Sequence, residues 1–202
     1  MTLLEDTKTE TFREACSRVL ETERLVLRAP RLEDAKAMAR LANDRRIAEN
    51  TARIPHPYRL ADAESFIASI NKPGGETAFA ITLADADGTL VGCCGLAPAE
   101  RSAPELGYWL GQPYWGRGYA TEAVHAVIDH AFTSAGYDAL QAGARVTNPG
   151  SRRVLEKCGF QWTGVGLYRI RALGSSAPID RFRLERGIWA SLRSWGRVRS
   201  LA

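Results

Sequence analysis

Hydrophobic and polar residues alternate along several short segments of the chain, which is the pattern of a strand with one face buried. Residues 22–29 place Leu25 and Leu27 on one face, and Pro30 ends the run. Further strands are predicted at 79–83, 89–97, 105–110, 139–146, 160–171 and 179–189. The turn at Asp87-Gly88 predicts that the strands at 79–83 and 89–97 form an antiparallel hairpin.

Apolar residues that recur every three to four positions predict helices between these strands. Helices are predicted at 32–42, 61–70 and 149–158, and a short polar helix at 8–19. The strongest stripe belongs to a central helix that ends before Gly136 and consists of Ala120, Ala123, Val124, Val127, Ile128, Ala131 and Phe132. Residues 43–60 are predicted to form a loop that is too long for a simple connection, and therefore one with a function.

This order of elements predicts an α/β (α+β) fold with a mixed, mostly antiparallel central sheet and helices on both faces. The 202 residues, 45% of them hydrophobic, are enough for one sizeable core. We expect one domain at 22–190, preceded by an extension at 1–21 and followed by a basic tail at 191–202.

Composition excludes several classes of function but identifies none by itself. No apolar stretch is long enough for a membrane span, so a cytoplasmic protein is expected. The net charge of +4 would suit an acidic cofactor, but nucleic acid is an unlikely partner because the arginine-rich end lacks interleaved aromatic residues. Metal is not expected, because His125 and His130 lie five residues apart and the four cysteines, at 16, 93, 94 and 158, lack metal-type spacing.

A glycine-rich turn joins the strand at 105–110 to the central helix, and it is the most informative segment of the chain. Gly116, Gly118 and Ala120 leave the backbone open, so consecutive N–H groups can converge on a phosphate at the positive end of the helix. The segment lacks both the Gly-Lys-Ser/Thr ending of an ATPase loop and the three-glycine spacing of a dinucleotide fingerprint. Another phosphate-bearing cofactor is therefore predicted.

The turn resembles the acyl-coenzyme A loop of the GNAT N-acetyltransferase superfamily, which reads Gln or Arg, two residues, Gly, one residue, then Gly or Ala. Gly118 and Ala120 match the small positions, whereas Trp115 replaces the usual Gln or Arg. With this tryptophan the motif resembles that of the RimJ/RimL-type branch, which acetylates protein N-termini. The resemblance covers residues 22–189. It implies the GNAT fold, with a splayed parallel pair of strands at 105–110 and 139–146 that holds the pantetheine arm.

The resemblance also implies a set of residues that bind acetyl-CoA. Arg117 would add charge beside the phosphates. The full set is Tyr108, Trp109, Leu110, Trp115, Gly116, Arg117, Gly118, Tyr119, Ala120, Thr121, Asn148 and Ser151.

Acetyl transfer to an amine needs a base and a proton for the departing thiolate. The superfamily often places its base at the position of Glu105, although this residue also reads as a solvated carboxylate at a strand end. Asn148 is a good helix N-cap before Pro149 and, by resemblance, also a contact of the pantetheine. The usual tyrosine acid of the family is replaced by Leu155, so Ser151 is the candidate that supplies the proton.

The resemblance implies direct attack in a ternary complex, with no acyl-cysteine. The acceptor is predicted to be a protein N-terminal α-amine, with Arg53 and Tyr58 of the long loop forming part of its pocket. Two alternatives stay open: a small amine such as an antibiotic, an amino acid or a polyamine, and a catalytically weak coenzyme A-binding or ribosome-associating module. The oligomeric state is not predicted.

Overall fold

The computed structural model describes residues 19–70, 76–85, 87–99 and 102–199, and its strands form one sheet. The strands are β1 (Leu20–Glu21), β2 (Leu25–Arg28), β3 (Thr77–Leu83), β4 (Leu90–Ala97), β5 (Glu105–Leu110), β6 (Ala139–Arg145), β7 (Gln161–Ile170) and β8 (Ser175–Glu185). Within the described residues their order is β1-β2-β3-β4-β5-β6-β8-β7, and every neighbouring pair except β5–β6 is antiparallel. The predicted fold class is confirmed.

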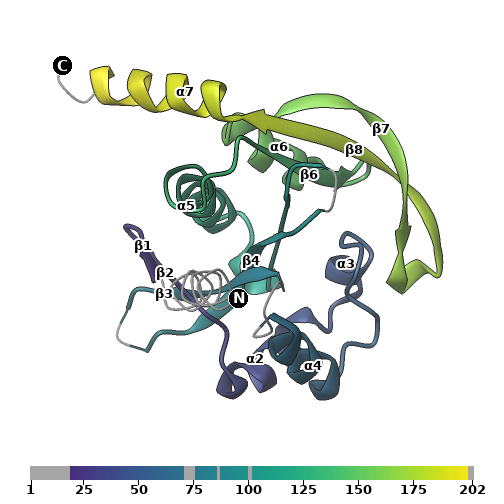
Figure 1. Cartoon of the computed structure of the whole chain (residues 1–202). Coiled ribbons are helices and arrows are strands. Elements are labelled where there is room, and N and C mark those ends of the chain that lie inside the picture. Colours follow the sequence, from purple (N-terminus) through teal and green to yellow (C-terminus); the bar gives the residue numbers. More distant parts are fainter. Residues whose placement is uncertain (1–18, 71–75, 86, 100–101, 200–202) are drawn as a thin grey trace, which may run out of the picture.

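Helices cover both faces of this sheet, as the sequence predicts (Figure 1). The helical elements are η1 (Leu32–Asp34), α2 (Ala35–Ala42), α3 (Arg45–Ala48), α4 (Leu60–Ile70), η2 (Gln112–Tyr114), α5 (Tyr119–Thr133), α6 (Pro149–Lys157), η3 (Arg171–Leu173) and α7 (Arg186–Arg199). In the described part of the chain, no helix is long and apolar enough to cross a membrane.

Two hydrophobic cores lie on opposite faces of the sheet. Val127 and Phe132 of α5 pack with Leu140 in the larger core, whereas α2 and α4 form the smaller one. Adjacent residues of β4 belong to different cores, because Cys94 lies in the larger core and Cys93 in the smaller one. The alternation of a strand thus gives each face its own apolar layer.

The parallel pair β5–β6 is joined at one end only. Glu105 pairs with Gln141 and Leu106 with Ala142, and no pairing continues from there toward Leu110. The predicted splay is therefore present, and it leaves backbone groups of the second half of β5 without a strand partner on that side.

The long β7–β8 hairpin curves away from the rest of the sheet, and its tip reaches the region of α3 (Figure 1). The backbone N–H of Arg171 in η3 donates to the carbonyl of Ala52 at 3.0 Å. Segments that are more than one hundred residues apart thus meet beside the splayed strands.

Three sequence-based boundaries differ from the structure. The predicted loop at 43–60 contains the short helix α3, which the Asp44 side chain caps by accepting from the N–H of Arg46 at 2.8 Å. The predicted extension at 1–21 ends in β1, and the predicted helix at 8–19 lies almost entirely outside the described residues.

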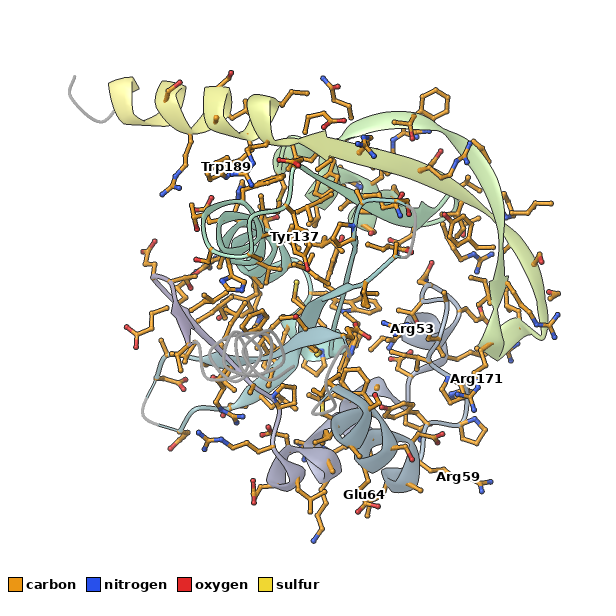
Figure 2. All side chains as sticks on the ribbon, viewed as in Figure 1. Arg53, Arg59, Glu64, Tyr137, Arg171 and Trp189 are labelled. Carbon is orange, nitrogen blue, oxygen red and sulfur yellow. The ribbon has the colours of Figure 1, made fainter. Side chains whose placement is uncertain are left out.

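The last predicted strand, 179–189, is displaced by four residues at both ends, because β8 spans Ser175–Glu185 and α7 follows. Figure 2 shows Trp189 near the start of α7, facing α5, and its indole N–H donates to Asp129 at 2.7 Å. The Arg186 guanidinium binds the carbonyl oxygen of Tyr137. These contacts with distant residues favour the helix, and the predicted boundary at 190/191 falls inside it.

Candidate active site

One cavity of about 1300 Å³ opens where β5 and β6 diverge. Its walls include residues of β5, the turn before α5, the first half of α6, and the segment from α3 to α4. Most of the predicted cofactor-binding residues line it, namely Tyr108, Trp109, Leu110, Trp115, Gly116, Gly118, Tyr119, Ala120, Thr121, Asn148 and Ser151. The predicted substrate-binding residues, Arg53 and Tyr58, line its other end together with Glu105.

The glycine-rich turn presents bare backbone to this cavity. Gly116 and Gly118 have positive φ angles of 74° and 83°, and a Cβ atom at Gly116 would have nothing within 4 Å. Gly118 is the N-cap of the 15-residue helix α5, and no side chain caps that helix end. The first-turn N–H groups of a helix have no partner within the helix, so these donors fit the oxygen atoms of a phosphate group.

Arg24 supports this turn from behind, a role that the sequence does not reveal. Its guanidinium donates to the carbonyl of Arg117 at 2.9 Å and to the carboxylate of Glu122 at 2.8 Å, and it lies 4.8 Å from the ring centroid of Tyr119. Arg117, by contrast, is not among the residues that line the cavity. The turn therefore offers its backbone to the cavity, and the predicted charge of the Arg117 side chain is not part of the wall.

Trp115 connects the same turn to α3. Its indole N–H donates to the carbonyl of Leu110 at 2.7 Å, and the Arg46 guanidinium lies 5.3 Å from its ring centroid. The substitution of tryptophan for the usual polar residue thus closes the gap between the turn and the opposite wall of the cavity.

Two hydroxyl groups meet on the α6 side of the splayed strands. The Asn148 side chain accepts from the N–H of Ser151 at 3.1 Å, which confirms the predicted N-cap. The Ser151 hydroxyl lies 2.8 Å from the hydroxyl of Tyr108, and burial raises the pKa of that tyrosine. The sequence analysis assigns Tyr108 to cofactor binding as part of β5 and does not predict this pairing, because residues 43 positions apart share no local pattern.

A carboxylate cluster occupies the opposite side of the sheet. Burial raises the pKa of Glu105, the Arg53 guanidinium opposes that shift, and the charge of Glu76 adds to it. Arg53 and Glu76 form a bidentate ion pair with N–O distances of 2.6 and 2.8 Å. Figure 2 shows Arg53 between α3 and the sheet. Glu76, which the sequence analysis does not single out, thus neutralises Arg53 beside the predicted base.

The remaining wall of the cavity includes Tyr58 and basic residues of α6. Tyr58 is only 9% exposed and packs in the core of α2 and α4, and burial raises its pKa to about 12. On α6, Arg153 and Lys157 line the cavity, whereas Arg152 pairs with Glu156 and Asp180. Among the described residues, no group of three or more His, Cys, Asp or Glu side chains is arranged to hold a metal ion.

Proteins similar to this chain include several that are named as acetyltransferases. The chain is 31% identical over 169 residues to an uncharacterized N-acetyltransferase, p20, of Bacillus licheniformis. This alignment covers 82% of this chain and 94% of the relative. Among solved structures, RimJ of Mycobacterium smegmatis in complex with CoA-disulfide matches with a TM-score of 0.70 and 22% identity, over 80% of this chain and 81% of that chain. A spermidine N-acetyltransferase of Vibrio cholerae in complex with CoA and spermine matches with a TM-score of 0.71 and 21% identity, over 84% and 99%.

The family itself is shown by the sequence. A family model described as an acetyltransferase (GNAT) domain matches residues 24–161, which include β2 to β6, the glycine-rich turn and α6. The chain therefore belongs to the GNAT acetyltransferase family, and it is an acetyl-CoA-dependent N-acetyltransferase.

Proposed function

We propose that this enzyme acetylates the α-amine of a protein N-terminus, by direct attack of the amine on the thioester of acetyl-CoA. The observation that carries the proposal is the state of Glu105. Of the carboxylates that line the cavity in the described part of the chain, Glu76 is paired with Arg53 and Asp62 accepts from the N–H of Arg59. Glu105 alone among them has no hydrogen-bond or ion-pair partner in the described residues, so it is free to take a proton.

The cost of deprotonating the acceptor favours an α-amine. At pH 7 an α-amine with a pKa of about 7.7 to 8.0 costs about 1 to 1.4 kcal/mol to deprotonate, whereas a lysine near 10.4 costs about 4.6 kcal/mol. One carboxylate base, with a pKa raised by burial, suffices for the first cost more readily than for the second. The resemblance of the glycine-rich turn to the RimJ/RimL-type branch, which acetylates protein N-termini, supports the same class of acceptor.

The residues divide the proton transfers between the two sides of the sheet. Glu105 removes a proton from the attacking amine on the side of α3, and Ser151 donates a proton to the departing sulfur on the side of α6. Tyr108 holds the Ser151 hydroxyl at 2.8 Å and orients it. Glu105 loses its proton and Ser151 regains one from solvent, so the enzyme returns to its starting state.

Direct attack also agrees with the state of the cysteines at the cavity. Burial raises the pKa of both Cys93 and Cys94, so each is a neutral thiol rather than a nucleophilic thiolate. The amine is therefore the group that attacks the thioester.

A small amine is the second candidate, since the spermidine enzyme shares the fold. The charges around the cavity speak against a polyamine. Arg145 and Arg171 line the cavity and form no ion pair within the described residues, and a chain of several ammonium groups would meet them.

A panel of acceptors tests the proposal through release of free thiol from acetyl-CoA. At pH 7 we expect kcat/KM for a peptide with a free N-terminus to exceed that for the same peptide with a blocked N-terminus and one internal lysine by at least about a hundredfold. Spermidine serves as the small-amine arm. Equal turnover of the blocked peptide, or a preference for spermidine over every peptide, contradicts the proposal.

Removing the Ser151 hydroxyl tests the acid. We expect Ser151→Ala to lower kcat by about tenfold to a hundredfold and to leave the Kd of acetyl-CoA unchanged, because the hydroxyl acts on the leaving sulfur. Tyr108→Phe is expected to lower kcat less, and the double variant to resemble Ser151→Ala, since the two act as a unit. Stopped-flow assays measure kcat, and calorimetry measures the Kd of acetyl-CoA. Full activity of Ser151→Ala would leave that serine only the structural role of its backbone N–H, which donates to the N-cap Asn148.

A further inference from the structure

Glu105, Gly143 and Arg145 face the same side of the sheet, toward α3. In β6, Ala142 and Ala144 are buried in the core beneath α5, so the alternation of the strand directs positions 143 and 145 to the opposite face. The Glu105 carboxylate lies 3.9 Å from the position that a Cβ atom would take at Gly143. Arg145 is two residues further along the strand, which corresponds to about 6.6 Å. A fixed positive charge thus follows the predicted base on one wall of the cavity.

The Arg145 guanidinium has hydrogen-bonding capacity that this chain does not use. One terminal nitrogen donates to the carbonyl of Glu49 at 3.0 Å, which holds the side chain against the end of α3. Its Nε atom is buried and has no hydrogen-bond partner, and no carboxylate in the described residues forms an ion pair with it. A buried donor without a partner is destabilising. The other N–H groups of the guanidinium can donate to an oxygen atom of a molecule bound in the cavity.

Asn50, the residue after Glu49, has a buried hydrogen-bond acceptor without a partner. Its amide nitrogen donates to the carbonyl of Arg46 at 2.8 Å, whereas its side-chain oxygen is buried without a partner. Asn50 and Arg145 both line the cavity, and so does Arg171, which is exposed and has no ion pair among the described residues. Figure 2 places Arg171 near the tip of the β7–β8 hairpin, beside the segment that carries α3.

We infer that the acceptor carries a carboxylate a few bonds from its reactive amine, and that Arg145 binds this carboxylate while Glu105 faces the amine. Arg171 adds positive charge at the cavity. The inference rests on the proposed function and specifies its substrate: a protein N-terminus with an acidic first or second residue. Arg53 does not fill this role, because Glu76 neutralises it.

Matched peptides test the inference. Two pairs differ by one charge each, Asp-Ala against Asn-Ala and Ala-Asp against Ala-Asn at their first two positions. We expect kcat/KM of the acidic member of at least one pair to exceed that of its amide by about tenfold or more. Arg145→Gln should abolish this preference by raising the KM of the acidic peptide, and Arg145→Lys should retain part of it.

Arg59→Gln is the matched control, because Arg59 is exposed, does not line the cavity and points away from the fold (Figure 2). It should keep the preference. The Kd of acetyl-CoA and the Tm of each variant are measured beside the kinetics, so that a folding defect is separated from lost recognition. Equal kcat/KM for both members of both pairs, a preference that survives Arg145→Gln, or a rise of only the acetyl-CoA KM overturns the inference.

Free aspartate and free alanine form a further arm that distinguishes the source of the carboxylate. If they react faster than every peptide and lose this advantage in Arg145→Gln, the carboxylate site is supported and the protein N-terminus of the proposed function is overturned. If all peptides react equally well, the proposed function stands and the carboxylate site fails. The two failures are therefore distinguishable.

Discussion

Gly118→Val is expected to abolish acetyl-CoA binding, with a rise of at least about a hundredfold in Kd. Gly118 has a φ angle of 83°, and a Cβ atom there would lie 3.3 Å from the Arg24 guanidinium, so a β-branched residue distorts the turn. The backbone donors at the start of α5 would then no longer converge. Loss of two hydrogen bonds to a charged phosphate, at about 1.5–3 kcal/mol each, corresponds to at least about a hundredfold in affinity. Isothermal titration with acetyl-CoA measures the change.

Gly136→Val provides the control for backbone strain. Gly136 has a similar φ angle of 73°, follows the other end of α5, and does not line the cavity. Both variants are expected to have a lower Tm, but only Gly118→Val should lose its affinity for acetyl-CoA. Retained affinity in Gly118→Val, or equal loss in both variants, would refute the assignment of the turn.

Glu105→Gln is expected to lower kcat/KM by about a hundredfold near pH 6.5–7, within the range of general-base contributions. Because burial raises the pKa of Glu105, the carboxylate becomes protonated and inactive at a higher pH than an exposed glutamate would. The wild-type rate therefore falls on the acid side through this group and through the amine. Above a pH of about 8 the α-amine deprotonates without help, so the difference between wild type and variant should narrow.

Glu64→Gln is the matched change on the exposed surface of α4, where Figure 2 shows Glu64 directed away from the sheet. It should leave both the rate and the pH profile unchanged. A Glu105→Gln enzyme whose pH profile overlays that of the wild type would remove Glu105 as the base. The kcat/KM profile from pH 5.5 to 9.5 decides this, with a peptide α-amine as acceptor.

Local patterns of the sequence were enough for most of the strands and for the glycine-rich turn. The bounds of β5 agree with the predicted strand at 105–110, and Gly118 precedes α5 as expected. Such features depend on alternation, helical spacing and glycine, which act over a few residues. The end of β8 was misjudged because α7 is fixed by contacts with Tyr137 and Asp129, which belong to other parts of the fold.

The candidate site shows the same division. The sequence analysis predicts Glu105 and Ser151 through the resemblance to the GNAT superfamily, and the bare backbone of the turn from its glycine residues. It does not show that Tyr108 reaches Ser151, nor that Glu76 neutralises Arg53. These partners lie 43 and 23 residues apart, and chain spacing of that size carries no directional information.

The sequence by itself determined the family, through its similarity to GNAT proteins, and it determined most of the strands and the glycine-rich turn, which follow from short-range backbone preferences. Only the tertiary structure decided which charges remain without a partner at the cavity. Arg145 donates to the carbonyl of Glu49 at the end of α3 and shares one cavity wall with Asn50 and Glu105, because β6 lies beside β5. Electrostatic recognition depends on distances through space, and folding alone brings these side chains within reach of one acceptor.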